Sequence, residues 1–448
     1  MNRPIRMLRY NTGTDKKAFI KYRKEFDAVI FNSTIVAYSG ASVADLVSMY
    51  ANKYIIDPQT HIFQQELSAL SSNKNQLKKS VEKYLKALPE ELSNPIINEK
   101  RMVGLSDLME NLDMLVKKVY EFQANYVNGF IKKKEYEKYL VYSDVKPEPR
   151  MFVAPYFMLK DKYSYEECVD WIDLNIAALH SMVAENMNNQ STIKVAAQIV
   201  LERRTLENDE IINYLIRAYD QPGYEYVFIW IDNFNSFESE IELNKAFSFL
   251  IKRLNDIGKK PLMAYGGYDS ILLCNEKSPY KMYGVAQSVG YGEYRSITPV
   301  GGGIPINKYY FKPLHKRMKF DEVAQILLNN GFFTDEDKSS MAHLFYNDIC
   351  SCETCKGIIK DNIDNFNKYN GLTSYVMMTK NGPSERNRAT NEALLLAAFH
   401  FLACKVDEWN LIVKYDYDEL LDLLKKAYKK YLSEMASSID NWCEVYGS

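Results

Sequence analysis

Short apolar segments that alternate with amphipathic stretches constrain the fold of this 448-residue chain more than any other feature. Most of these segments are continuous runs of Val, Ile, Phe and Tyr, which is typical of strands buried on both faces. We expect strands at residues 27–32, 53–57, 151–159, 192–201, 224–232, 260–266 and 282–290. Helical patterns occupy 165–187 and 243–258, and this alternation of strand with helix predicts a parallel sheet.

The number of strand and helix units favours an α/β fold of the (β/α)8 TIM-like barrel type over an open sheet, although the count alone does not decide. Residues 1–64 would begin the barrel, residues 65–148 would form a helical insertion rich in Lys, Glu and Leu, and residues 149–318 would complete the barrel. Residues 319–448 are mainly helical in pattern, with an apolar helix at 394–409. A hydrophobic content of 47% is sufficient for such a core.

The overall charge excludes bulk attraction to a polyanion, because 56 basic residues face 58 acidic ones and the formal charge is −2. Any nucleic-acid binding must therefore come from a local basic patch. The sequence begins without the apolar stretch of a signal peptide, and no apolar run approaches the roughly 18 residues that span a bilayer. We expect a cytoplasmic protein without a membrane partner, whose cysteines stay reduced.

The sequence CSCETC places Cys350, Cys352 and Cys355 in one C-x-C-x-x-C motif, which is three of only seven cysteines. Three thiolates at this spacing can meet one tetrahedral Zn²⁺ at bond lengths of about 2.3 Å. His400 is the preferred fourth ligand and His343 the alternative, although His400 could instead be a core histidine bonded to a backbone carbonyl. A closed site of four ligands would make this zinc structural, and residues 319–448 a zinc-binding helical subdomain.

The remaining cysteines are interpreted as scattered buried thiols. They are Cys168, Cys274, Cys404 and Cys443.

A barrel pattern followed by C-x-C-x-x-C and a later helical histidine resembles the tRNA-guanine transglycosylase superfamily, patchily over residues 50–410. These enzymes exchange guanine for a 7-deazaguanine base in nucleic acid. DPQTHIFQ is similar to the family's D-S-G-G-F-Q, AAQIV to V-Q-G, and LMAYGG to L-M-G-V-G. The resemblance implies that Asp57 attends the reacting base, that Phe63 and Met263 stack on its two faces, and that Gln198 binds its edge.

The chain departs from the family at three places. The family's nucleophilic Asp on the seventh strand is replaced in AQSVGYGEY by Gln287, and an amide cannot attack an anomeric carbon as a carboxylate can. We therefore group Gln287 with the base-binding residues. The family's guanine-reading Asp is lost, since VAPYF carries Tyr156 or Phe157 in that region. The sequence WIDNF replaces a glycine loop and introduces Asp232.

Cleavage of an N-glycosidic bond needs one carboxylate to stabilise or trap the oxocarbenium-like state and a second acidic group for the leaving base. Asp57 and Asp232 end two predicted strands, where barrel active sites gather, and are the catalytic candidates. An Asp at a strand's end can instead cap the next helix. Tyr265 and Tyr268 are further candidates for holding a flipped base, or are simply core.

The segment 307–320 interleaves basic and aromatic residues, a pattern that suits contact with a nucleic-acid backbone. Its candidate phosphate ligands are Lys308, Lys312, Lys316 and Arg317. A solvated surface strand is the alternative interpretation.

These features together predict a pentosyltransferase that replaces guanine in DNA with a 7-deazaguanine derivative, such as one from a preQ0-type precursor. DNA is preferred over tRNA because the guanine-reading Asp and the glycine loop are missing, so that the chain resembles more the divergent members that modify DNA in phages and bacteria. The alternatives are a tRNA-guanine transglycosylase, a non-catalytic nucleic-acid-binding subunit that keeps the barrel and the zinc, and an unrelated zinc-containing barrel enzyme. A second protein subunit is a further expected partner if Gln287 marks a lost nucleophile.

Overall fold

The chain folds into two compact units. The computed structural model describes residues 3–10, 13–51, 53–72, 76–131, 147–289, 293–298, 306–334, 337–379 and 382–447. The first unit, which we call the barrel unit, comprises residues 1–11, 26–266 and 279–300. The C-terminal unit comprises residues 12–25, 267–278 and 301–448, so the division is not the linear one expected from the sequence.

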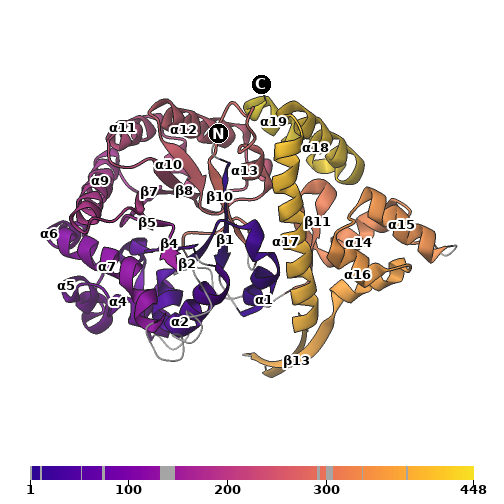
Figure 1. Ribbon diagram of the computed structural model, residues 1–448, viewed down its shortest axis with the longest axis horizontal. Helices are drawn as coiled ribbons and strands as arrows, with labels where there is room; N and C mark the ends of the chain where they lie inside the picture. The colour runs from indigo at the N-terminus through magenta and orange to yellow at the C-terminus, as the bar shows by residue number, and fades with distance from the viewer. Residues whose placement is uncertain are drawn as a thin grey trace. The chain divides into compact units, whose positions relative to one another are not determined.

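Parallel strands form the centre of the barrel unit, in the order β4-β3-β2-β1-β10-β9-β8-β7-β5 (Figure 1). They are β1 (Ile5–Tyr10), β2 (Ala28–Asn32), β3 (Lys53–Asp57), β4 (Glu148–Pro149), β5 (Met151–Val153), β7 (Lys194–Leu201), β8 (Tyr226–Ile231), β9 (Lys260–Met263) and β10 (Gly284–Ser288). A short additional strand, β6 (Met158–Leu159), also pairs with β7.

The strand order returns on itself through residues 148–153. β4 pairs with β3 and β5 pairs with β7, and only Arg150 separates β4 from β5. The backbone N–H of Arg150 donates to the carbonyl of Tyr54 on β3 at 2.6 Å. The α/β class and the parallel sheet are therefore confirmed and are consistent with the expected TIM-like fold. The strands are buried on both faces, as their apolar runs indicated.

Helices of the barrel unit lie outside these strands (Figure 1). The larger ones are α2 (Ser33–Leu46), α9 (Tyr165–Asn188), α11 (Asp209–Tyr219) and α12 (Ile241–Asp256). Helix α9 begins with a capping box, because Ser164 Oγ accepts from the N–H of Glu167 at 3.2 Å while Glu167 accepts from the N–H of Ser164 at 2.8 Å. Helix α12 ends just before Gly258, whose φ of +75° is a left-handed conformation typical of a helix C-terminus.

Several helices lie between β3 and β4, as the pattern at 65–148 indicated. They are α3 (Leu67–Leu70), α4 (Lys79–Leu85), α5 (Glu90–Asn94), α6 (Leu105–Glu110) and α7 (Leu112–Ile131). Residues 132–146 of the expected insertion lie outside the described residues.

Two strand predictions need correction. The expected strand 151–159 is divided into β5 and β6. Between them, side chains and not a neighbouring strand accept the backbone hydrogen bonds: Thr60 Oγ1 accepts from the N–H of Tyr156, and Asn175 Oδ1 accepts from the N–H of Phe157. Strand β1 was not predicted, because its two arginines interrupt the apolar run.

The C-terminal unit is mainly helical, as expected, but it also contains two antiparallel hairpins. One pairs β11 (Lys308–Phe311) with β12 (Lys316–Lys319), and the other pairs β13 (Leu372–Thr379) with β14 (Gly382–Ala389). The main helices are α14 (Phe320–Asn329), α15 (Lys338–Asp348), α16 (Glu353–Ile359), α17 (Asn391–Lys414), α18 (Tyr417–Tyr431) and α19 (Ala436–Tyr446). The mainly helical pattern after residue 318 did not indicate β13 and β14, where Thr, Tyr and Val favour a strand.

Among the helices of the described ranges, none has the length and apolar character needed to cross a bilayer.

Candidate functional site

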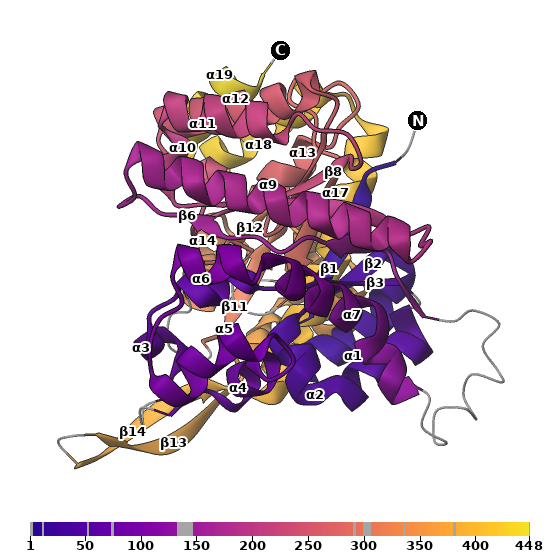
Figure 2. The ribbon, with the colours of Figure 1, turned by 90° about the vertical axis from the view of Figure 1, so that its left-hand side faces the viewer.

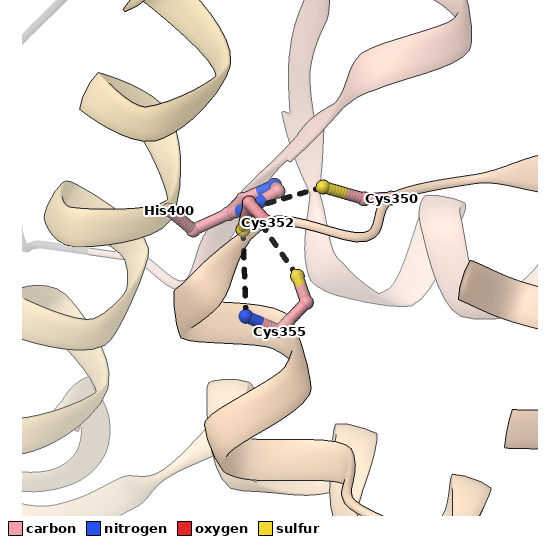
Figure 3. A group of neighbouring side chains, drawn as sticks. All are labelled: Cys350, Cys352, Cys355 and His400. Carbon is pink, nitrogen blue, oxygen red and sulfur yellow. Dashed lines mark hydrogen bonds between the residues drawn. The ribbon is translucent and has the colours of Figure 1, made fainter. Parts of the chain in front are cut away.

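The C-terminal unit brings the three motif cysteines and His400 together around one point (Figure 3). Cys352 is the N-cap of α16 and its Sγ accepts from the N–H of Cys355 at 3.4 Å, which folds the motif into a tight turn. His400 comes from the middle of α17, so two elements distant in the sequence supply the cluster.

The geometry of this cluster fits a tetrahedral metal. His400 Nδ1 lies 3.9, 3.4 and 3.3 Å from Sγ of Cys350, Cys352 and Cys355, and all four ligand atoms lie within 4.8 Å of one another. Bonds of about 2.3 Å to sulfur and about 2.0 Å to nitrogen separate tetrahedral ligands by roughly 3.6 to 3.8 Å. The four residues could therefore bind a metal such as zinc.

His400 has a different partner for each ring nitrogen. Its Nε2 lies 2.7 Å from the carbonyl oxygen of Tyr310, which can only accept, so Nε2 carries a proton. In the neutral imidazole that binds a metal, Nδ1 would therefore be the lone-pair donor. The two alternatives for His400, metal ligand and carbonyl-bonded core histidine, are therefore compatible. The fully buried ring also stacks on Tyr309, with centroids 4.2 Å apart.

The electrostatics of the cluster favour a cation. Hydrogen bonds from Cys352, Cys355 and Cys404 hold the pKa of Cys350 well below its usual range, whereas burial raises the pKa of Cys355 well above it. Burial lowers the pKa of His400, but Cys350 and Cys352 together, through their charges and hydrogen bonds, raise it to about 10. Deprotonation of further cysteines in this buried place needs a compensating positive charge, which a bound metal would supply.

Cys404 also belongs to this neighbourhood, and its interpretation as a scattered thiol was wrong. Its Sγ lies 3.7 Å from His400 Nδ1 and 4.0 Å from Cys350 Sγ. The signal was present in the sequence, because residues four apart on a helix share a face and Cys404 follows His400 by one turn.

Asp57 is the centre of a second polar cluster, inside the barrel unit. Its Oδ2 accepts from Arg9 Nη1 at 3.0 Å, and its Oδ1 accepts from the Tyr156 hydroxyl at 2.7 Å and from the N–H of Gln59 at 3.2 Å. Asp57 and Arg9 are only 1% and 2% exposed. Asp57 comes last in β3 and lies on the same side of its strand as Ile55 of the interior core, so its carboxylate faces the barrel interior.

Arg9 is held by several groups besides Asp57. Its Nε donates to the carbonyl of Ala264 at 2.6 Å and its Nη1 to Asn32 Oδ1 at 3.2 Å, and the guanidinium lies 3.9 Å from the ring centroid of Tyr265. Burial alone would lower the pKa of Arg9, but Tyr265 and Asp57 raise it, so the side chain stays charged.

Aromatic rings continue from Asp57 across the interior. His61 stacks on Tyr156 with centroids 5.4 Å apart and meets Trp230 edge-on at 5.3 Å, and Trp230 lies 4.7 Å from Tyr265. His61 Nδ1 is 3.2 Å from the Tyr156 hydroxyl oxygen. Because that hydroxyl uses its single hydrogen to donate to Asp57, the hydrogen bond with His61 must be donated by His61 Nδ1–H to the Tyr156 oxygen. Burial lowers the pKa of His61 to about 4, so the imidazole is neutral at pH 7.

Asp232 follows β8 and contacts the segment that follows β10. Its Oδ1 accepts from Ser296 Oγ at 2.8 Å and from the N–H of Ile297 at 2.7 Å. The carbonyl of Arg295 in the same segment accepts from Trp230 Nε1 at 2.9 Å. Asp232 therefore ties residues 295–297 to the carboxyl end of β8 and does not cap the helix that follows in sequence.

The predicted base-binding residues divide between the two sides of their strands. Gln198 lies on the interior side of β7, between Ala196 and Val200 of the core, and its Nε2 is buried without a hydrogen-bond partner among the described residues. Met263 and Gln287 alternate with interior residues of β9 and β10, so they point toward the helices. Phe63 is fully buried in the short helix that follows β3 (Thr60–Gln64).

The remaining aromatic candidates also separate. Tyr265 lines the Asp57 cluster, whereas Tyr268 belongs to the C-terminal unit and stacks on His315 with centroids 3.5 Å apart.

The basic residues of 308–317 make several contacts inside the C-terminal unit. Lys312 Nζ lies 2.7 Å from Asp407, Lys316 Nζ lies 3.3 Å from Met435 Sδ, and the Arg317 guanidinium lies 4.0 Å from the ring centroid of Phe401. Lys308 is exposed. Their contact with a nucleic-acid backbone stays a prediction.

Sequence reasoning missed Arg9, His61 and Trp230, which together with Asp57 and Tyr156 make the barrel cluster. Arg9 and Trp230 lie at or near the carboxyl ends of strands, which is the one signal that could have indicated them.

Comparison with known proteins adds only distant likenesses. No family model and no curated protein matches the chain. The catalytic domain of a GH26 endo-β-1,4-mannanase from Bacillus sp. JAMB-750 is 10% identical, with 66% of this chain and 80% of that chain covered and a TM-score of 0.35. An engineered protein is 11% identical, with 67% of this chain and 66% of that chain covered and a TM-score of 0.34. Likenesses this distant say nothing about function.

Proposed function

We propose that this protein is a base-exchange transglycosylase, a pentosyltransferase that replaces guanine in DNA with a 7-deazaguanine derivative. The observation that carries the proposal is the position of two aspartates. Asp57 ends β3 and Asp232 follows β8, at the carboxyl ends of parallel strands, where barrel enzymes place their catalytic groups. Aromatic side chains of the kind that hold a flipped base lie beside Asp57.

Asp232 is the better candidate to react with the sugar. It is half-buried, and both of its hydrogen bonds described above reach Oδ1, which leaves Oδ2 to face a substrate. In the proposed step Oδ2 attacks the anomeric carbon, the C–N bond to guanine breaks, and the bonding electrons leave with the base. Guanine leaves as an anion and takes a proton from water. The incoming base then displaces the carboxylate and loses its ring N–H proton to water, so that no net proton is consumed.

Asp57 is assigned to the base. Arg9 compensates its charge and Tyr156 fixes its orientation, so the carboxylate is held in one place at the interior end of the site. Gln198 supports the same assignment, because a buried amide N–H without a partner suits a carbonyl oxygen on a base edge. Phe63, Met263 and Gln287 remain predicted base-binding residues, although Met263 and Gln287 lie on the helix-facing side of their strands.

The zinc of this proposal is structural. Cys350, Cys352, Cys355 and His400 make a closed set of four ligands, which leaves no position for a substrate. Its chemistry when bound is to neutralise the thiolates and to fasten α16 to α17.

A second candidate function is a non-catalytic nucleic-acid-binding subunit that acts with a partner protein. Gln287 favours it, because this residue occupies the place of the family's nucleophile and is an amide. A tRNA substrate is the other alternative.

The test is base exchange by the purified chain. DNA and tRNA that carry radiolabelled guanine are incubated separately with a 7-deazaguanine base of the preQ0 type, and release of label is followed. We expect release from DNA, and release reduced at least about 1,000-fold by Asp232→Asn and Asp57→Asn. The exposed Asp256→Asn is the matched control. Release from tRNA alone would refute the DNA substrate, full activity of both variants would refute the catalytic pair, and inactive wild type would favour the subunit.

A further inference from the structure

The hairpin of β13 and β14 is exposed on both faces. Leu372, Val376 and Met377 are 51%, 67% and 42% exposed. Both views show the hairpin extending beyond the helices of its own unit (Figures 1 and 2). An exposed two-stranded ribbon with apolar side chains is an aggregation hazard unless something binds it.

The register of the hairpin gathers its arginines on one face. Thr373 pairs with Arg388, Tyr375 with Arg386 and Met377 with Ser384, and directly paired residues share a face. We call these six residues the arginine face. The Arg388 guanidinium lies 5.6 Å from the ring centroid of Tyr375, which holds it above the strands.

Acidic charge is absent from the arginine face among the described residues. The hairpin's acidic residue, Glu385, pairs with Val376 on the opposite face and is hydrogen-bonded by Ser374. The arginine face therefore carries two positive charges and no compensating carboxylate of its own strands, which is a match for a polyanion.

We propose that the arginine face docks on duplex DNA, an inference that rests on the DNA substrate of the proposed function. Each strand has eight residues and spans about 27 Å. A two-stranded ribbon fits the B-DNA major groove, which is about 12 Å wide, whereas the deep, narrow groove of A-form RNA excludes it. Arg386 and Arg388 are two residues apart, about 7 Å along one strand, and reach successive phosphates or base edges.

The test is DNA binding by the full chain, measured by fluorescence anisotropy on a labelled 30-base-pair guanine-containing duplex between about 50 and 200 mM salt. The variant is R386Q/R388Q. Two lost phosphate contacts predict at least about fivefold weaker binding and a slope of log affinity against log salt that is smaller by about 2. The control K426Q/K429Q removes two exposed charges from α18 of the same unit and should change neither quantity by a comparable amount. Glu385→Gln, on the opposite face of the hairpin, should not weaken binding.

The outcomes separate this inference from the proposed function. If the wild type binds and modifies DNA while R386Q/R388Q matches it in affinity and salt slope, the docking inference fails alone. If the variant binds less and the wild type never exchanges a base, docking stands and the activity fails. Equal binding of an RNA duplex, or a variant that changes the oligomeric state in sedimentation velocity but not DNA affinity, overturns the inference in favour of RNA or protein. Zinc content and circular dichroism confirm that each variant is folded.

Discussion

The buried ion pair between Arg9 and Asp57 allows a sharp test of how the barrel interior is held. Both side chains are 2% exposed and Nη1 lies 3.0 Å from Oδ2, so removing one partner leaves the other charge in the interior. Such a charge costs about 3–5 kcal/mol of the free energy of unfolding. Arg9→Met and Asp57→Asn are each expected to lower the free energy of unfolding by that amount.

The double variant R9M/D57N decides the interpretation. It contains neither charge, so it should be no less stable than either single variant, and the coupling free energy between the two positions should be at least about 3 kcal/mol. Because the chain has two compact units, the readout should be local: hydrogen exchange of the amides of β1 to β3, followed by mass spectrometry. The exposed pair Lys252 and Asp256 is the control and should couple by no more than about 0.5 kcal/mol.

The result that would refute this reasoning is additivity. If the two single losses sum in the double variant, the charges do not compensate each other, and the hydrogen bonds of Arg9 to Ala264 and Asn32 account for its contribution. High salt should leave the coupling unchanged, because buried pairs are screened much less than exposed ones.

Three further outcomes are expected. Burial lowers the pKa of His61 to about 4, so between about pH 6.5 and 4 the unfolded state binds a proton that the folded state does not bind. The free energy of unfolding should therefore fall by up to about 3 kcal/mol as the pH drops across this range. His61→Gln should remove that dependence in urea unfolding, and the exposed His180→Gln should not. Purified protein should contain one zinc per chain by elemental analysis, reduced by Cys350→Ser and retained by Cys443→Ser, and chelation should unfold the helices around α16 as judged by hydrogen exchange. Ser164→Ala should lower the free energy of unfolding by about 0.5–2 kcal/mol through loss of the α9 cap, and an unchanged urea midpoint would contradict the cap.

The strands that could be predicted from the sequence are those in which buried residues form an uninterrupted apolar run. Strand β1 was not predicted because Arg6 and Arg9 interrupt its apolar run. The residue that compensates the buried charge of Arg9 is Asp57, which lies 48 residues away in the sequence. A pattern read over a short window cannot contain that compensation. The same limit hid the direction of Met263 and Gln287, because a shift of one residue along a strand moves a side chain to the other face.

The candidate metal ligands Cys350, Cys352 and Cys355 were predictable because their close spacing in the sequence already brings their sulfurs together. Cys404 was missed because its partner is the distant motif, although it lies one helical turn from His400.

The surroundings of the metal cluster also change where nucleic acid should be sought in the C-terminal unit. The aromatic residues at 309–311 suggested stacking on bases, but the Tyr309 hydroxyl lies 3.2 Å from Cys355 Sγ and the Tyr310 carbonyl accepts from His400. Lys312 is likewise engaged by Asp407. Tyr309 and the backbone of Tyr310 therefore contact the Cys/His cluster, and Lys312 is held in an ion pair of its own unit. Tyr375, Arg386 and Arg388 of the second hairpin make no contact with the Cys/His cluster among the described residues, so this hairpin is the stronger candidate for contact with DNA.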